Sequence, residues 1–353
     1  MKLTWLRRLS GTDLVMFIVG LTLLAAIVYG SIVILLQGKY TLDQWENLVV
    51  YGLTQGSIYA LIALGYTLVY GILRMINFAH SEVFMAGPFT AFFVARAFNT
   101  SGFLNAQPLL AMGLVSLVAM VVSMGVALLV ERIAYRPLRA APRLVSLITA
   151  IGASYVLQYV FRGLYGNGIE RYPELNVLQG EVILAGVRFL RTQVVVIIAA
   201  LLLMAALYAF VQLTKVGKAM RAVSEDQEAA ALMGINVDAI IATTFAVGGA
   251  LAGAAGILYA LIFGQVQFIM GFVPGIKAFT AAVLGGIGNV PGAMVGGLFL
   301  GVFESVGPSL FLEGLGIPAP AQLKDVIAFT VLVLILIFRP SGILGERLST
   351  KKA

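Results

Sequence analysis

The sequence has no cysteine and only one histidine, His80, among 353 residues. Disulfide bonds and thiolate metal sites are therefore excluded, and a single histidine leaves little scope for a metal site or a Ser-His-Asp arrangement. There is also no phosphate-binding loop, because neither Gly-Lys pair, at 38–39 and 217–218, is followed by serine or threonine. We therefore predict that the chain is not an enzyme by itself and carries no cofactor or metal, so that any ATP is hydrolysed by another subunit.

Charged residues are scarce as well. They make up 11% of the chain against 60% apolar residues, whereas soluble domains average about 25% charged and about 45–50% apolar residues. Such a chain has too little polar surface for water and is suited to a lipid bilayer. Its apolar runs are continuous rather than alternating, which favours an all-α polytopic membrane protein over a barrel. The net charge of +7 comes from loops beside these runs, so membrane topology explains it better than nucleic-acid binding.

Eight apolar stretches are long enough to predict membrane-spanning helices. They cover residues 14–36, 48–72, 77–98, 108–130, 144–162, 193–213, 237–262 and 322–338. A further apolar stretch at 276–306 is interrupted by glycines and Pro291, which break helices. We predict that it forms either a re-entrant hairpin or two half-length helices.

The basic residues predict the orientation, because cytoplasmic loops are rich in lysine and arginine. If the chain has eight spans, the basic residues of two loops and of the C-terminal tail lie on one side of the membrane, together with the N-terminal Lys2, Arg7 and Arg8. The basic residues of that side are Arg132, Arg136, Arg139, Arg143, Lys215, Lys218, Arg221, Arg339, Arg347, Lys351 and Lys352. Both termini are thus predicted to be cytoplasmic, and the loop at 164–192 is expected to be external and ordered.

The longest cytoplasmic polar segment, at 215–236, predicts a short helix over 225–234. Ser224 is placed to cap its first turn, acidic side chains follow at the positive end of the helix dipole, and Gly234 is placed to end it. A small apolar face at Ala229, Leu232 and Met233 suits docking on another protein. The alternative is a solvated helix in a connecting loop.

Polar residues also interrupt the apolar run at 74–88, where Asn77, His80 and Glu82 stand among apolar neighbours. Polar groups at membrane depth are costly, so we expect them to face a substrate pathway or, alternatively, to satisfy the backbone of a broken helix. Helical geometry places Glu82 about 200° around the axis from His80. Glu82 is therefore predicted to pair with a basic group such as Arg74 or to lie at the wet cytoplasmic edge.

Several motifs in one order resemble the LivH-type permeases of branched-chain amino-acid ABC importers. They are Glu228-Ala229-Ala230 followed by Gly234, which resembles the coupling loop of importer permeases, and the segments 65–71, 75–80, 131–139, 277–288 and 339–345. The resemblance covers residues 45–348, so that 1–44 contribute an extra helix and 349–353 a cytoplasmic tail.

The resemblance implies a permease in a bacterial plasma (inner) membrane, working with cytoplasmic ATP-binding subunits, a second related permease and an external substrate-binding protein. It implies ATPase coupling by Glu225, Asp226, Glu228, Ala229, Ala230 and Gly234. The residues predicted to line the translocation pathway are Asn77, His80, Glu82, Gly285, Gly286 and Gly288. An alternative function is an ion- or proton-coupled secondary transporter or channel, in which His80 and Glu82 would relay protons.

Overall fold

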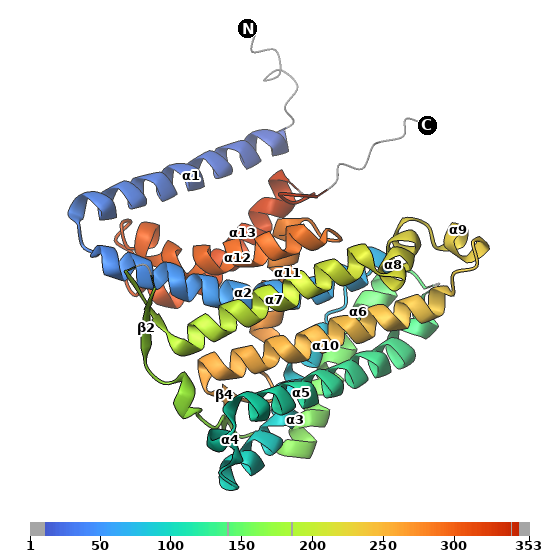
Figure 1. The fold of residues 1–353 in the computed structure, drawn as a ribbon. Coiled ribbons are helices and arrows are strands. Elements are labelled where there is room, and N and C mark those ends of the chain that lie inside the picture. The colour runs from blue at the N-terminus through green and yellow to red at the C-terminus, as the bar shows by residue number, and fades with distance from the viewer. Residues whose placement is uncertain (1–10, 140, 185, 340, 346–353) are drawn as a thin grey trace.

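A computed structural model describes residues 11–139, 141–184, 186–339 and 341–345. The described helices are α1 (Gly11–Gln37), α2 (Leu42–Leu73), α3 (His80–Thr100), α4 (Phe103–Ala106), α5 (Pro108–Val130), α6 (Arg143–Tyr165), α7 (Arg191–Leu213), α8 (Lys215–Glu225), α9 (Gln227–Leu232), α10 (Val237–Phe263), α11 (Phe272–Gly285), α12 (Val290–Gly307) and α13 (Lys324–Phe338) (Figure 1). The predicted basic residues Lys2, Arg7, Arg8, Arg347, Lys351 and Lys352, and the predicted tail at 349–353, lie outside the described residues.

The membrane-spanning character of the fold is confirmed. Among the described residues, 8 helical stretches are long and apolar enough to cross a membrane: α1, α2, α5 with the turn that follows it, α6, α7, α10, α12 with the π-helical turn η5 (Pro308–Leu312), and α13 with the turn before it. The predicted span at 77–98 is not one of them, because α3 begins only at His80 and has polar residues in its first turn. The eighth stretch is instead α12 with η5, which comes from the glycine-rich part of the sequence.

Four short strands lie in the loops of the described part of the chain. β1 (Glu170–Arg171) pairs with β4 (Gln265–Val266), and β2 (Glu181–Leu184) pairs with β3 (Val187–Leu190), both antiparallel. Three of these strands lie in the loop between α6 and α7. The predicted external loop is therefore ordered, and β1 ties it to the end of α10.

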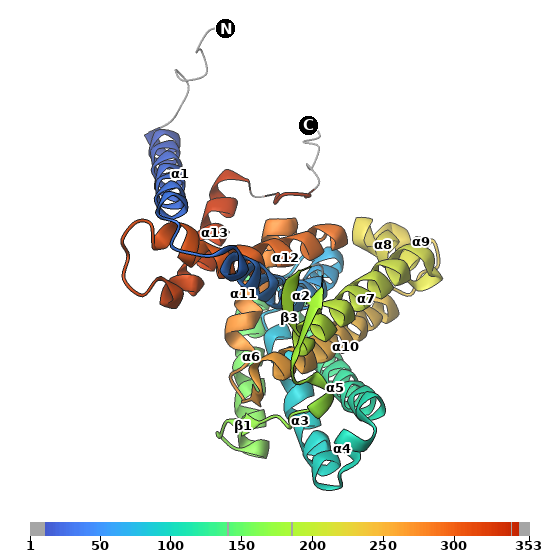
Figure 2. The same ribbon diagram turned by 60° about the vertical axis from the view of Figure 1, so that its left-hand side comes forward.

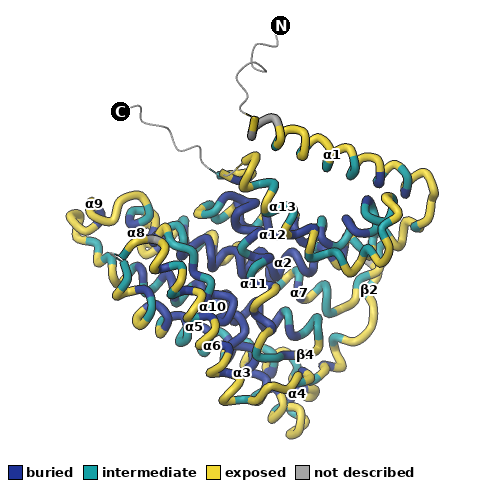
Figure 3. Tube along the Cα trace, turned by 180° about the vertical axis from the view of Figure 1, so that it is seen from behind, coloured by how far each residue is buried: buried dark blue, intermediate teal, exposed yellow. Residues whose placement is uncertain are grey.

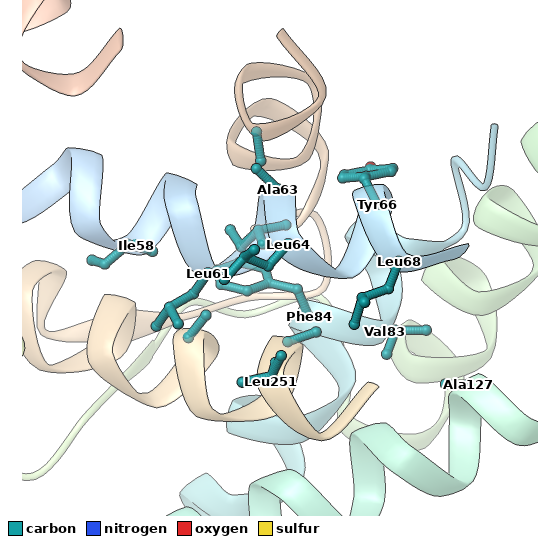
Figure 4. Packing of buried hydrophobic residues seen from close by; sticks show 14 of the residues in the cluster. Ile58, Leu61, Ala63, Leu64, Tyr66, Leu68, Val83, Phe84, Ala127 and Leu251 are labelled. Carbon is teal, nitrogen blue, oxygen red and sulfur yellow. The ribbon is translucent and has the colours of Figure 1, made fainter. Parts of the chain in front are cut away.

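The core is centred on α2, which is buried along most of its length and lies among the other helices (Figure 3). Leu61 and Leu64 of α2 are fully buried and pack beside Phe84 of α3 and Leu251 of α10 (Figure 4). The outward faces of the peripheral helices expose large apolar side chains, which suits contact with lipid.

Glycines allow α2 and α12 to cross at close range. A Cβ on Gly301 of α12 would collide with the backbone of Gly52 and Gly56 of α2, and one on Gly297 would collide with the backbone of Ala60. In lipid, small residues let helix backbones approach and gain dispersion energy. The same applies to Gly249 and Gly253 of α10, which face α5.

The helix α1 stands apart from the rest of the bundle (Figures 1 and 2). It meets η5 and the turn after it, where Gly30 lies against the backbone of Phe311 and Gly314. Next to this contact, Lys39 pairs with Glu313, and their hydrogen bond lowers the pKa of that carboxyl group. A second contact lies at Gly20, where a Cβ would meet the ring of Phe338 at the end of α13, so α1 touches the bundle at two places.

The glycine-rich stretch forms two helices joined by a turn, so the predicted helix break is present. α11 ends at Gly285 and α12 begins at Val290. The C-terminal segment 341–345 covers this turn: Leu344 N donates to Gly285 O at 3.0 Å, and Asn289 Nδ2 donates to Leu344 O at 2.8 Å. Gly286 has φ +105°, which a side chain rarely tolerates. The membrane depth of this hairpin remains a prediction.

Candidate translocation pathway and coupling segment

The polar residues after α2 lie at a real interruption between two helices. α2 ends at Leu73, and Arg74 has a left-handed backbone with φ 53°, uncommon for a residue with a side chain. α3 starts at His80. Asn77 is buried in this interruption, where its Oδ1 accepts a hydrogen bond from Tyr135 Oη at 3.0 Å.

His80 lies against α2. Its Nε2 is in contact with the backbone position of Gly65, where a Cβ would collide with the ring, and the ring of Tyr66 meets it edge-on at a centroid distance of 5.0 Å. The side chain is buried, and Nε2 has no hydrogen-bond partner among the described residues. A buried polar atom without a partner is costly and marks a place where another group can bind.

Glu82 is fully buried and faces α6. Its Oε1 accepts hydrogen bonds from Ser81 at 3.3 Å, Ser154 at 3.2 Å and Gln158 at 2.8 Å, whereas Oε2 has no partner among the described residues. The prediction that Glu82 pairs with Arg74 or lies at a wet edge is therefore wrong. α6 brings two donors one helical turn apart to this carboxyl group, and that neighbour could not be known from the local sequence.

The three glycines assigned to the pathway pack elsewhere. Gly285 lies against the backbone of Gly292, Gly286 lies against Gly345, and Gly288 lies near Gly71 at the end of α2. Close backbone packing at Gly285 and Gly286, and the positive φ of +96° at Gly288, explain the need for glycine there without a substrate. Their role in a pathway remains a prediction, separate from the group at Asn77, His80 and Glu82.

The predicted helix at 225–234 is instead divided between two helices, so its start is corrected. α8 runs on through Ser224, whose hydroxyl donates to Arg221 O within that helix, and it ends at Glu225. Asp226 caps the next helix, α9: its Oδ1 accepts from the backbone N–H groups of Glu228 and Ala229, both at 2.9 Å.

The coupling segment, defined as residues 215–234, ends as the sequence predicts. α9 ends at Leu232, and Gly234 follows with φ +84°, the left-handed geometry that favours glycine after a helix. Ala230 is buried, while Leu232 and Met233 are 89% and 82% exposed. Two adjacent large apolar side chains this exposed form a small apolar tip suited to a partner surface.

Sequence analysis missed a buried ion cluster. Lys277 of α11 pairs with Glu304 of α12 and, at 2.6 Å, with Asp325 of α13. Lys277 and Glu304 are 3% and 1% exposed, and the ammonium group lies 5.8 Å from the centre of the Tyr59 ring. The available signal was a lone lysine and a lone glutamate, each within an apolar helix, because buried charges in membranes require partners.

A second ion network joins the end of α5 to the start of α10. It extends from the π-helical turn η2 (Glu131–Tyr135) into the next turn. Arg139 pairs with Glu131 and with Asp238 of α10, and Arg136 pairs with Asp238 at 2.6 Å. No group of three or more metal-binding side chains occurs among the residues that the structure describes.

The chain is similar to known transport proteins along most of its length. A family model described as the permease component of branched-chain amino acid transport systems matches residues 48–336. The high-affinity branched-chain amino acid transport system permease protein BraD of Pseudomonas aeruginosa is 44% identical over 301 residues, covering 84% of this chain and 95% of BraD. The corresponding protein LivH of Escherichia coli K12 is 42% identical over 315 residues, covering 88% and 97%.

Similarity extends to an archaeon. A probable branched-chain amino acid transport permease protein LivH of Methanocaldococcus jannaschii is 26% identical over 310 residues, which cover 86% of this chain and 94% of that protein. No solved structure matches the chain.

Proposed function

Because the chain belongs to the family of permease components of branched-chain amino acid transport systems, we propose that it forms the translocation pathway of an ATP-driven importer for branched-chain or related amino acids. The observation in the structure that carries this proposal is α9, a capped helix with an exposed apolar tip between two long apolar helices. Such a tip is suited to receive the movement of a separate ATPase, with Glu225, Asp226, Glu228, Ala229, Ala230 and Gly234 forming the coupling surface.

The proposed assembly contains two cytoplasmic ATP-binding subunits, a second related permease and an external substrate-binding protein in a bacterial plasma membrane. Both termini are cytoplasmic in this arrangement, and residues 45–348 form the permease domain. Its support is the family membership, with α1 lying before the matched residues 48–336.

The alternative of a proton-coupled secondary transporter requires His80 and Glu82 to exchange protons. In the structure, His80 packs on α2 at Gly65 and Glu82 bonds to α6 at Gln158. The two side chains face different helices, as their angular separation on α3 predicts. This separation supports the importer over the proton relay.

The proposed function is tested by reconstituting the permease with its ATPase and permease partners in proteoliposomes and adding the external binding protein. We expect leucine, isoleucine or valine uptake to require ATP at the ATPase face and to stop with a nonhydrolysing ATPase variant. Uptake by this chain alone, driven by a proton or ion gradient, would establish the secondary transporter instead.

Substitution of Gly234 by valine should uncouple ATP hydrolysis from uptake. A β-branched residue at φ +84° is strained by about 1–2 kcal/mol, so the end of α9 must shift and its apolar tip moves from its docking position. The measurement is uptake per ATP hydrolysed, which we expect to fall at least about tenfold. Gly316→Val is the matched control, because Gly316 has φ +73° and open space around it far from α9 along the chain. Normal coupling in Gly234→Val would show that the segment is a simple connector.

Substitution of Glu82 by glutamine isolates the unpartnered carboxyl oxygen. The amide oxygen can keep the three bonds now made by Oε1, while Oε2 is replaced by an NH2 group, so we expect normal amounts of folded complex. If this oxygen serves gating or substrate passage, maximal uptake should fall about tenfold with little change in the half-saturating substrate concentration. Glu82→Leu removes every acceptor and should reduce assembly as well. Parent-like uptake by Glu82→Gln would remove Glu82 from the pathway.

A further inference from the structure

The coupling segment is hydrogen-bonded directly to the α2–α3 break, defined as residues 72–79, which include the last two residues of α2. Gln227 Nε2 of α9 donates to the backbone oxygen of Ile72 at 2.8 Å, and Arg74 Nη2 donates to the backbone oxygen of Ser224 at 3.2 Å. The partners are 155 and 150 residues apart in the sequence. One bond has its donor on the coupling segment and the other has its donor at the break, so each element holds the other.

The end of α2 explains why Gln227 binds there. The last four carbonyl groups of a helix have no intrahelical partner, and Ile72 lies in the last turn of α2. The left-handed Arg74 ends the helix, so the Ile72 oxygen is free to accept from a side chain. The bond itself is partly buried, although Gln227 as a residue is exposed. The break therefore uses a residue of the coupling segment to complete its own backbone hydrogen bonding.

The other side of the break is held through a different element. Tyr135, the last residue of η2, donates to Asn77 in the middle of the break. The turn after η2 holds Asp238 in the first turn of α10 through Arg136. Asn77 is thus held by η2, and the turn that follows η2 is paired with α10. The break leads directly into His80 and Glu82.

We infer that Gln227 and Arg74 are positioning residues that make the coupling segment and the α2–α3 break move as one unit. Displacement of α9 is then delivered to the polar start of α3 through these side-chain bonds. The inference rests on the proposed function and names the internal route by which that function operates. The competing route is α7, the helix before α8, which is bonded to α8 by Arg221 Nη1 and Gln212 Oε1 at 2.7 Å.

Two identical substitutions distinguish these routes. Gln227→Ala removes the side-chain bond to the break, and Gln212→Ala removes the side-chain bond between α7 and α8. In the reconstituted complex we expect uptake per ATP hydrolysed to fall about fivefold in Gln227→Ala, the factor associated with one neutral hydrogen bond. Gln212→Ala should match the parent. Parent-like coupling in Gln227→Ala, or an equal loss in Gln212→Ala, would overturn the inference. Failure of ATP-driven uptake in the parent complex would instead overturn the proposed function.

A covalent bridge provides the second measurement, and it is simplified by the absence of cysteine from the chain. Arg74→Cys combined with Ser224→Cys removes the side chain that joins the break to α8 and places a thiol on each element. We expect reduced coupling in this double variant and its restoration by a short bifunctional thiol reagent. Arg74→Cys alone should stay reduced with the reagent, whereas Ser224→Cys alone should couple like the parent, because Arg74 bonds to the backbone oxygen of Ser224. A bridge that forms but blocks uptake, or that leaves coupling reduced, would show that the elements move relative to each other and would overturn the inference.

Discussion

Lys277→Met should lower the free energy of unfolding by about 3–5 kcal/mol, the usual cost of removing one partner of a buried ion pair. The loss is expected to be this large because Glu304 is 1% exposed and would keep a charge without its main partner. Methionine fills a similar volume, so the effect is electrostatic rather than a cavity. The measurement is denaturant unfolding of the purified permease in detergent, together with the yield of monodisperse protein.

The control for this substitution is a second change at the other partner. Glu304→Gln in the Lys277→Met background removes the unpaired charge and should recover most of the lost stability, since neutral groups are far less costly to bury. Asp325 is half exposed and can remain solvated in both variants. Parent-like stability of Lys277→Met alone would mean that the cluster does not hold α11, α12 and α13 together.

The long helices were predictable because an apolar run of sufficient length has few other structures available in lipid. The predicted spans 108–130 and 237–262 end within one residue of α5 and α10. Pro108 at the start of α5 and the left-handed Gly264 after α10 give these boundaries a local cause. Such local signals are what a sequence records most directly.

The coupling segment shows where local signals are insufficient. Ser224 and Asp226 are both good capping residues, and the sequence pattern does not choose between them. The choice is made by packing: Met220 and Val223 are buried, which keeps α8 helical through Ser224, and Asp226 is the next residue able to cap. The cap position therefore depended on tertiary contacts of α8 that periodicity alone does not give.

Glu82 was misplaced for a related reason. The angle of 200° around α3 correctly separated it from His80, but an angle does not identify the neighbouring helix. The donors come from Ser154 and Gln158, four residues apart on one face of α6. That polar pair is a usable signal, since polar side chains in membrane helices usually mark contacts with other helices.

The second large effect is expected at the crossing of α2 and α12, where glycine is required on both helices. Even a single Cβ added at Gly301 would collide with the backbone of Gly52 and Gly56. Backbone atoms cannot move aside as a flexible side chain can. A larger side chain must therefore push the two helices apart along the most buried part of α2. Overpacking of a core usually costs about 1–3 kcal/mol, and separation of two helix backbones adds the loss of their dispersion contacts.

Gly301→Leu is accordingly expected to reduce the folded yield severely and to lower the free energy of unfolding by more than about 3 kcal/mol. Gly113→Leu is the matched control, because Gly113 lies within the apolar helix α5 and a Cβ there meets nothing within 4 Å. The two variants have the same added volume and hydrophobicity, so only the close helix crossing differs between them. Gly301→Ala should lie between the parent and Gly301→Leu in unfolding free energy. Equal stability of Gly301→Leu and Gly113→Leu would contradict a glycine-dependent crossing as the centre of this fold.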